Sequence, residues 1–197
     1  MQIDIFGYIF IFFILVICLK IYNESDAFGL KCIISDVDGE KYCVRERNKL
    51  ELAADLLAKV TEKMQKLVNY VANKNPNNED VKRLVKNFNP KKISETLPTS
   101  ELTAYSENKG EKIAFCLNTT KTGNKLIDIN TLTFVAIHEL AHCMTASVGH
   151  KPEFWQNMKF LLINAKEANI YKPVDYKNTP RDYCGVVISD NPYYDIK

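Results

Sequence analysis

All three histidines of this 197-residue chain lie within thirteen residues, at His138, His142 and His150. The surrounding segment, residues 134–158, reads FVAIHELAHCMTASVGHKPEFWQNM. Its apolar residues recur at three- and four-residue steps, which predicts a helix. Residues four apart on a helix lie on one face, with Cβ atoms about 5–6 Å apart. We therefore predict that His138 and His142 stand side by side and bind one zinc ion, Zn²⁺.

The residue after the first histidine is Glu139, which a helix places on an adjacent side of the same turn. From there a carboxylate can reach a zinc-bound water rather than the metal itself. Zinc lowers the pKa of such a water from about 15.7 to about 7 and polarises a carbonyl oxygen. The pattern predicts Glu139 as the catalytic base of a hydrolytic reaction.

A catalytic zinc site takes three protein ligands and leaves a fourth position open. Gly149 can reverse the chain in the left-handed conformation, so that His150, at the start of the next helix, folds back toward the metal. The plainer interpretation of His150 is a surface histidine at a helix start. Because two ligands already precede it, we predict His150 as the third, with Phe154 and Trp155 packing its helix onto the first.

Four helices are predicted after the N-terminal region. A long amphipathic helix carries apolar residues from Leu50 to Val71, and residues 81–88 form a short one. The helix with the first two histidines is capped by Asp128 or Asn130 and ends near Gly149. Pro152 suits the first turn of a helix that continues to Ala168.

Two strands complete the predicted α+β domain. Apolar residues alternate or cluster in residues 102–105 and 112–117, on the two sides of a turn at Gly110. This pattern predicts a small antiparallel sheet. Residues 90–98, with a proline at each end, are predicted to be a loop. The tail from Tyr171 onward is rich in Tyr, Pro and Asp and is also predicted to be a loop.

The sequences HELAH and GHKPEFW resemble the zincin metallopeptidases of the WLM and SprT-like kind, in which a further ligand histidine precedes an aromatic pair. The resemblance spans residues 45–168. It implies a compact zincin-like fold, zinc at the three histidines, Glu139 as the base, and a polypeptide substrate along an edge strand. Addition of a substrate strand to an exposed strand such as residues 112–117 agrees with this.

The chain departs from the WLM pattern in two respects. Seven residues separate His142 from His150, where five are common. WLM and SprT-like enzymes of DNA–protein crosslink repair are soluble, whereas this chain begins with an apolar run, so the repair role is not transferred. An anchor before such a domain resembles membrane proteins of large DNA viruses, which predicts a viral or virion membrane.

The apolar run covers residues 5–22, interrupted by Lys20, and would form about 27 Å of helix. That is enough to cross a bilayer as a single-pass anchor. The alternative is a signal peptide cleaved after Ala27, which would make the protein secreted. No Lys or Arg precedes the run, which favours the anchor. We expect an anchor in residues 1–22, a linker and hairpin in residues 23–44, and the peptidase domain in residues 45–197.

Five cysteines follow the anchor, so the pairing is open. Cys32 and Cys43 flank a turn at Asp38-Gly39 that can bring them together; the alternative is two reduced thiols. Cys143 is expected to pack against the sheet or to pair with Cys116, rather than to bind the metal.

Tyrosine side chains supply the candidates for a second catalytic group. We expect a tyrosine to stabilise the oxyanion of the reaction. The candidates are Tyr171, Tyr176 and Tyr183, and the sequence does not distinguish between them.

The 26 basic and 24 acidic residues are mixed along the chain without a basic stripe, so no nucleic-acid partner is expected. The sequence predicts a membrane-anchored zinc metallopeptidase acting on polypeptides. The main alternative is a non-catalytic, zinc-stabilised membrane or envelope protein. Glu139 favours the enzyme, because a purely structural zinc site has no need of a base.

Overall fold

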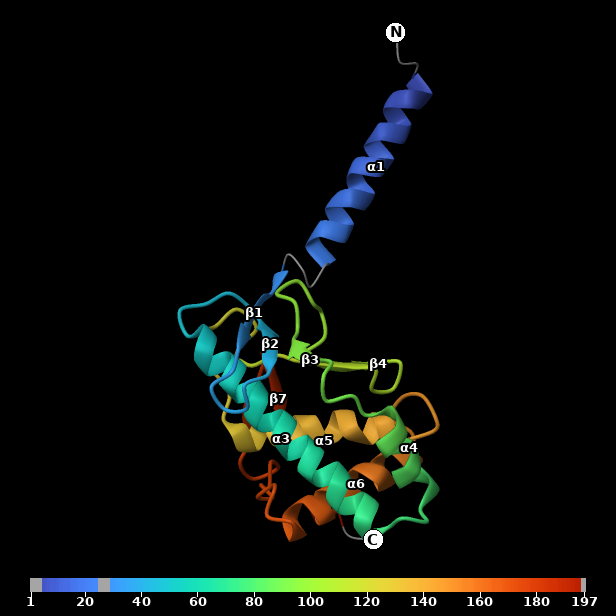
Figure 1. Cartoon of the computed structure of the whole chain (residues 1–197), viewed down its shortest axis with the longest axis vertical. Coiled ribbons are helices and arrows are strands. Elements are labelled where there is room, and N and C mark those ends of the chain that lie inside the picture. Colours follow the sequence, from blue (N-terminus) through green and yellow to red (C-terminus); the bar gives the residue numbers. More distant parts are fainter. Residues whose placement is uncertain (1–4, 25–28, 196–197) are drawn as a thin grey trace.

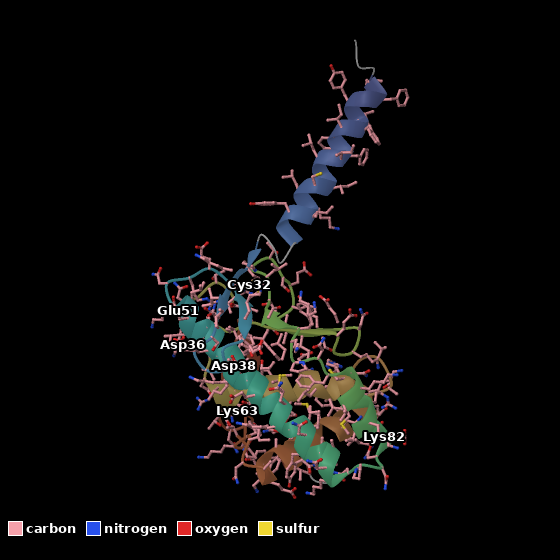
Figure 2. The ribbon with its side chains drawn as sticks, viewed as in Figure 1. Cys32, Asp36, Asp38, Glu51, Lys63 and Lys82 are labelled. Atoms are coloured by element: carbon pink, nitrogen blue, oxygen red, sulfur yellow. A yellow bond between two sulfur atoms is a disulfide. The ribbon has the colours of Figure 1, made fainter. Side chains whose placement is uncertain are left out.

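A computed structural model describes residues 5–24 and 29–195 (Figure 1). Helix α1 (Ile5–Glu24) stands away from the rest of the chain. Apolar side chains surround it, and none of the stretch Ile5–Tyr22 is buried (Figure 2). The helix is long and apolar enough to cross a membrane, and a signal sequence would have the same character. The candidate cleavage site at residues 25–27 lies outside the described residues.

Five strands form one sheet in the order β1-β2-β3-β5-β4. Their bounds are β1 (Lys31–Ile34), β2 (Lys41–Val44), β3 (Ile93–Glu95), β4 (Ala104–Glu107) and β5 (Lys112–Phe115). The first two strands form an antiparallel hairpin in which Cys32 lies opposite Cys43, and these cysteines form the disulfide that the turn suggested. Gly39 takes a positive φ of 75° in that turn, which suits a residue without Cβ.

The α+β class is confirmed, but the sheet is mixed rather than antiparallel. β4 and β5 pair antiparallel around Gly110, as predicted, whereas β3 pairs parallel with both β2 and β5. The predicted loop at residues 90–98 contains β3, so that prediction was wrong. Three residues are too short to show a strand period, and the strand exists because helices carry the chain across from β2.

The two crossover helices are α3 (Leu50–Lys74) and α4 (Glu79–Asn87), close to the predicted ones. The buried face of α3 packs against helix α5 (Ile129–Met144) and helix α6 (Pro152–Glu167), and together they enclose the core. Pro152 occupies the first turn of α6, as predicted. The predicted end of the histidine-bearing helix near Gly149 was wrong, because α5 ends at Met144.

The tail contains more structure than the predicted loop. Strands β6 (Arg181–Tyr183) and β7 (Val186–Ile188) form a hairpin, followed by the short 3-10 helix η1 (Pro192–Tyr194). A disulfide joins Cys184 to Cys116, directly after β5. The suggested Cys116–Cys143 pairing was therefore wrong. Cys143 is a buried free thiol that packs in the core, as the first of its two predicted roles required.

The charged side chains labelled in Figure 2 are spread over the domain. Asp36, Asp38 and Glu51 lie toward the β1–β2 end, and Lys82 lies across the domain on α4.

Candidate metal centre

Helix α5 positions the first two histidines. Its N-terminus is capped by Asp128, whose carboxylate accepts hydrogen bonds from the Thr131 N–H at 2.9 Å and the Thr131 hydroxyl at 2.6 Å. The helix is buried between α3, α4 and α6. His138 and His142 lie one turn apart on its accessible face, with ring centroids separated by 5.0 Å. The predicted side-by-side arrangement is present.

The third histidine reaches the same point from outside the helix. Gly149 has a positive φ of 82°, and the chain reverses there before α6. His150 Nε2 lies 3.0 Å from His138 Nε2, and candidate donor nitrogens of the three histidines all lie within 4.8 Å of one another. Two nitrogens on one tetrahedral zinc would be about 3.3 Å apart, from Zn–N bonds of about 2.05 Å. The three-histidine group is therefore compatible with holding a metal ion.

Two aromatic residues of α6 support the histidines. The Phe154 ring is fully buried, and its centroid lies 4.8 Å from His138, 4.4 Å from His142 and 4.6 Å from His150. The Trp155 indole N–H donates to the His150 carbonyl at 3.1 Å. The aromatic pair packs α6 onto α5, as the sequence predicted, and fixes the backbone of the third histidine.

Residues 145–151, which we call the connection, span the longer gap between His142 and His150. Thr145 ends α5, since its N–H and hydroxyl both donate to the Ala141 carbonyl and its backbone turns extended. Arg83 donates to the Met144 carbonyl at 2.7 Å, and Asn87 donates to the Cys143 carbonyl at 3.0 Å. Side chains of α4 thus satisfy carbonyls that the ended helix leaves open.

The connection itself is held from two sides. The Lys109 ammonium, in the turn between β4 and β5, donates to the carbonyls of Thr145, Ala146 and Ser147 at 2.7, 2.5 and 2.9 Å. The Glu153 carboxylate accepts from the N–H groups of Ala146 and Ser147 at 3.0 and 3.3 Å, and from the Ser147 hydroxyl at 2.8 Å. Lys109 and Glu153 were not predicted to act here, because they lie far apart along the chain and match no local motif.

Glu139 is 4% exposed, and its Oε2 has no hydrogen-bond partner among the described residues. Burial raises the pKa of this carboxyl to about 8. A buried carboxylate oxygen without a partner is rare and points to a ligand, water or ion that completes it. Glu139 borders the same cleft as the three histidines, so its environment is that of a group able to exchange a proton near neutral pH.

His138 and His142 are held neutral. Burial, and then the neighbouring rings of His142 and His150, lower the pKa of His138 to about 3. Burial and the nearby His150 lower the pKa of His142 to about 4. A neutral imidazole has a free nitrogen lone pair, which is the form that binds a metal.

A cleft of about 410 Å³ opens in front of the histidines. One wall is the edge strand β4 with its following turn, and the other is α5 with the connection; Ala104, Ser106 and Lys109 face Glu139 across it. The exposed edge is therefore β4. The suggestion that residues 112–117 form it was wrong, because β5 lies between β3 and β4.

The three candidate tyrosines do not line this cleft. Tyr171 and Tyr176 are buried against Phe134, and the Tyr183 hydroxyl donates to the Thr103 carbonyl at 3.1 Å. Tyr105, on β4, is the tyrosine that lines the cleft within the described part of the chain. The sequence expectation for the oxyanion group therefore gains no support.

Comparison with known proteins gives a family. A family model described as the WLM domain matches residues 44–185. The uncharacterized protein R325 of Acanthamoeba polyphaga mimivirus is 32% identical over 181 residues, which cover 90% of each chain. The uncharacterized protein 136R of Invertebrate iridescent virus 6 is 32% identical over 82 residues, covering 41% of this chain and 44% of its own. No solved structure matches. The predicted resemblance is confirmed, and the chain belongs to the WLM domain family.

Proposed function

We propose that this protein is a zinc-dependent metallopeptidase that hydrolyses polypeptides and is tethered to a membrane through residues 5–22. The observation that carries the proposal is the buried Glu139 carboxylate, whose Oε2 has no hydrogen-bond partner among the described residues, beside the three-histidine group. The WLM domain is associated with metallopeptidases, and both relatives named above are viral proteins. A structural metal site would not need an ionisable group kept buried at its side.

The chain's own groups divide the reaction between them. His138, His142 and His150 would hold the zinc, which when bound supplies a Lewis acid for the substrate carbonyl and makes a coordinated water more acidic. Glu139 takes the proton from the attacking water and delivers it to the amine that leaves as the peptide bond breaks. Its raised pKa suits both transfers, because the carboxyl gains and loses a proton near neutral pH.

The edge strand β4 gives the substrate a place to bind. On one side it pairs with β5, and its other side faces the cleft. An extended polypeptide can add to such an edge through main-chain hydrogen bonds, which are independent of side-chain identity. In this proposal the substrate backbone lies across the three histidines, and unfolded segments are better substrates than compact proteins.

The two disulfides bear on which side of the membrane the domain occupies. Disulfides persist in oxidising compartments and are rare in the cytosol. Cys32–Cys43 and Cys116–Cys184 both lie in the domain that follows α1. The proposal therefore places the anchor with its N-terminus on the reducing side and the peptidase domain on the oxidising side.

The proposal is tested with the full chain in lipid nanodiscs, loaded with zinc and given a denatured, fluorescently labelled polypeptide. We expect bound zinc and hydrolysis, with a roughly 10²–10⁴-fold lower rate for Glu139→Gln, since that is the usual contribution of a general base. Glu62→Gln, which alters a surface acid of α3 paired with Lys66, is the matched control and should leave the rate unchanged. Bound zinc without hydrolysis of any polypeptide would instead support a non-catalytic, zinc-stabilised membrane protein.

A further inference from the structure

A second cavity, of about 350 Å³, lies on the far side of His138 from the cleft. His138 lines both spaces. Phe134, one turn before His138 on α5, and Met158 of α6 belong to the second one. We call it the Phe134 pocket. Because it shares a histidine with the metal centre, a substrate held at that centre extends directly to its mouth.

The inside of the Phe134 pocket is apolar. Phe134 and Met158 are core residues, Pro192 of η1 is buried, and the Trp155 indole forms a wall that is 43% exposed. The surface that a ligand would contact inside the pocket is therefore aromatic and aliphatic. Apolar walls of this kind select large apolar groups, since each buried methylene contributes about 0.8 kcal/mol.

Charge at the mouth does not redirect this preference. Asp190 and Asp195 line the pocket, but both pair with the Lys177 ammonium, at 3.1 and 3.7 Å. The Lys159 ammonium also donates to the Asp195 carbonyl. Lys177 thus pairs with both carboxylates, and the Lys159 ammonium lies beside the Asp195 backbone, which leaves burial of apolar surface as the main term.

The far wall is fixed by the C-terminal segment. The Asn191 side-chain amide donates to the Tyr171 hydroxyl at 3.1 Å and to the Val174 carbonyl at 2.8 Å, which holds the backbone just before Pro192 in place. This segment follows residue 185, where the match to the WLM domain ends. The pocket is therefore completed by residues that lie outside the family match.

Distances along α5 match an extended substrate. Phe134 and His138 are four residues apart, which is about 6 Å of helix. Two residues of an extended chain advance about 6.6 Å. Strand β4 runs in the same direction as α5, because Lys109, just after β4, donates to the carbonyls of Thr145 and Ala146 at the end of α5. The distance along α5 from His138 to Phe134 is therefore about that of two residues of an extended substrate.

We propose that the Phe134 pocket binds a large apolar side chain of the substrate, such as Leu, Met or Phe, next to the scissile bond. The inference rests on the proposed peptidase function, which it deepens by naming the substrate class. Met158 and Phe134 are specificity-determining residues in this account. The pocket gives sequence preference, while the edge strand β4 binds the substrate backbone without one.

The test measures equilibrium binding, so that it does not depend on turnover. The zinc-loaded full chain carrying Glu139→Gln, in nanodiscs, is titrated with fluorescent ten-residue Gly/Ser peptides that differ at one central position. We expect Leu and Phe peptides to bind roughly 10- to 100-fold more tightly than the Ala peptide, from the burial of one large side chain. Equal affinity for Ala and Leu, or tightest binding of a Lys or Asp peptide, would overturn the inference. Empty nanodiscs report partitioning of apolar peptides into lipid, which is subtracted.

Two variants locate the preference. Met158→Phe narrows the pocket and should abolish the advantage of the Phe peptide while leaving the Ala peptide unchanged. Ile163→Phe enlarges a partly exposed residue of the same helix outside the pocket and should change neither. A uniform loss for all peptides in folded Met158→Phe would contradict the assignment, and if that variant does not fold, the peptide series with the unaltered pocket decides.

Hydrolysis of the same peptides by the wild-type chain is measured separately. A binding preference without any hydrolysis would refute the peptidase function and leave the pocket assignment intact. Hydrolysis without any preference in the binding series would support the peptidase function and refute the pocket assignment.

Discussion

The two segments that bring histidines to the metal centre are held by different kinds of interaction. His138 and His142 share one buried helix, so their spacing is fixed by helix geometry and by the packing of α5 in the core. His150 lies within the connection, residues 145–151, which has no regular structure, and Lys109, Glu153 and Trp155 hold it from other elements. The helical pair is a local property of the sequence, whereas the third ligand depends on tertiary contacts.

The largest effect expected from this difference is on metal affinity when a histidine is removed. A complete zinc site contributes about 10–16 kcal/mol, so loss of one ligand should weaken zinc binding by roughly 10²–10³-fold. The loss of zinc affinity in His138→Ala should lie at the upper end of this range, because that variant no longer has the preformed helical pair. His150→Ala keeps the helical pair, and its loss of zinc affinity should be about tenfold smaller. The reason is that binding through His150 must order a residue of the connection, which costs about 1–2 kcal/mol and offsets part of what this ligand contributes.

Zinc affinities of the two variants, measured by competition with a chelating dye, check this order. Equal losses would mean that the connection is as well ordered without metal as the helix is. Unchanged affinity in His150→Ala would remove His150 from the ligand set.

The next effect is predicted for Lys109, which donates hydrogen bonds to three carbonyls of the connection. Lys109→Met keeps the length of the side chain and removes its charge and donors. We expect zinc affinity to fall by roughly 10–100-fold, as for other groups that orient metal ligands. Lys86→Met, at an exposed lysine of α4, is the matched control and should have no effect.

A double-mutant cycle shows whether Lys109 acts through His150. In a chain that already carries His150→Ala, Lys109→Met should cause no further loss of zinc affinity, because the ligand it positions is gone. Additive losses would mean that Lys109 stabilises the domain in general rather than the connection.

These contrasts explain which parts of the molecule could be predicted. The α5 pair, the long α3 helix and the β4–β5 hairpin follow from local periodicity and turn residues, and each was found. β3 has three residues and exists only because α3 and α4 carry the chain back beside β2. The Cys116–Cys184 pairing joins residues 68 apart, and the end of α5 is set by contacts from Arg83 and Asn87. Because these contacts join residues that are far apart in the sequence, no rule based on local residue spacing predicts them.

A smaller effect is expected at Gly149, whose positive φ sets the direction of the chain just before His150. A Cβ added there meets nothing within 4 Å, so substitution would test backbone conformation alone. The left-handed conformation costs an ordinary residue about 1–2 kcal/mol. Gly149→Ala should therefore weaken zinc binding by roughly tenfold. Gly149→Asn should lose less, since Asn tolerates this conformation, and equal losses for both would point to a cause other than φ.

The smallest effect concerns Glu153, and it depends on pH. Hydrogen bonds from the Ser147 hydroxyl and the Ala146 N–H lower the pKa of the Glu153 carboxyl below its ordinary value of 4.5. A lowered folded-state pKa means that the folded chain binds the proton less readily than the unfolded chain. The stabilisation is therefore fully present above pH 4.5 and is lost as pH falls through the lowered value.

Glu153→Gln removes this titration while keeping the shape of the side chain. Denaturant unfolding of the metal-free domain, followed by fluorescence of Trp155, the chain's one tryptophan, should show wild type more stable than the variant at pH 6. The difference should shrink as pH falls below 4.5, and because other groups titrate alike in both chains, they cancel in it. A difference that stayed constant from pH 6 to pH 3 would show that the carboxylate charge does not hold the connection. In that case Lys109 and Trp155 would hold the third ligand in place without a contribution from the Glu153 charge.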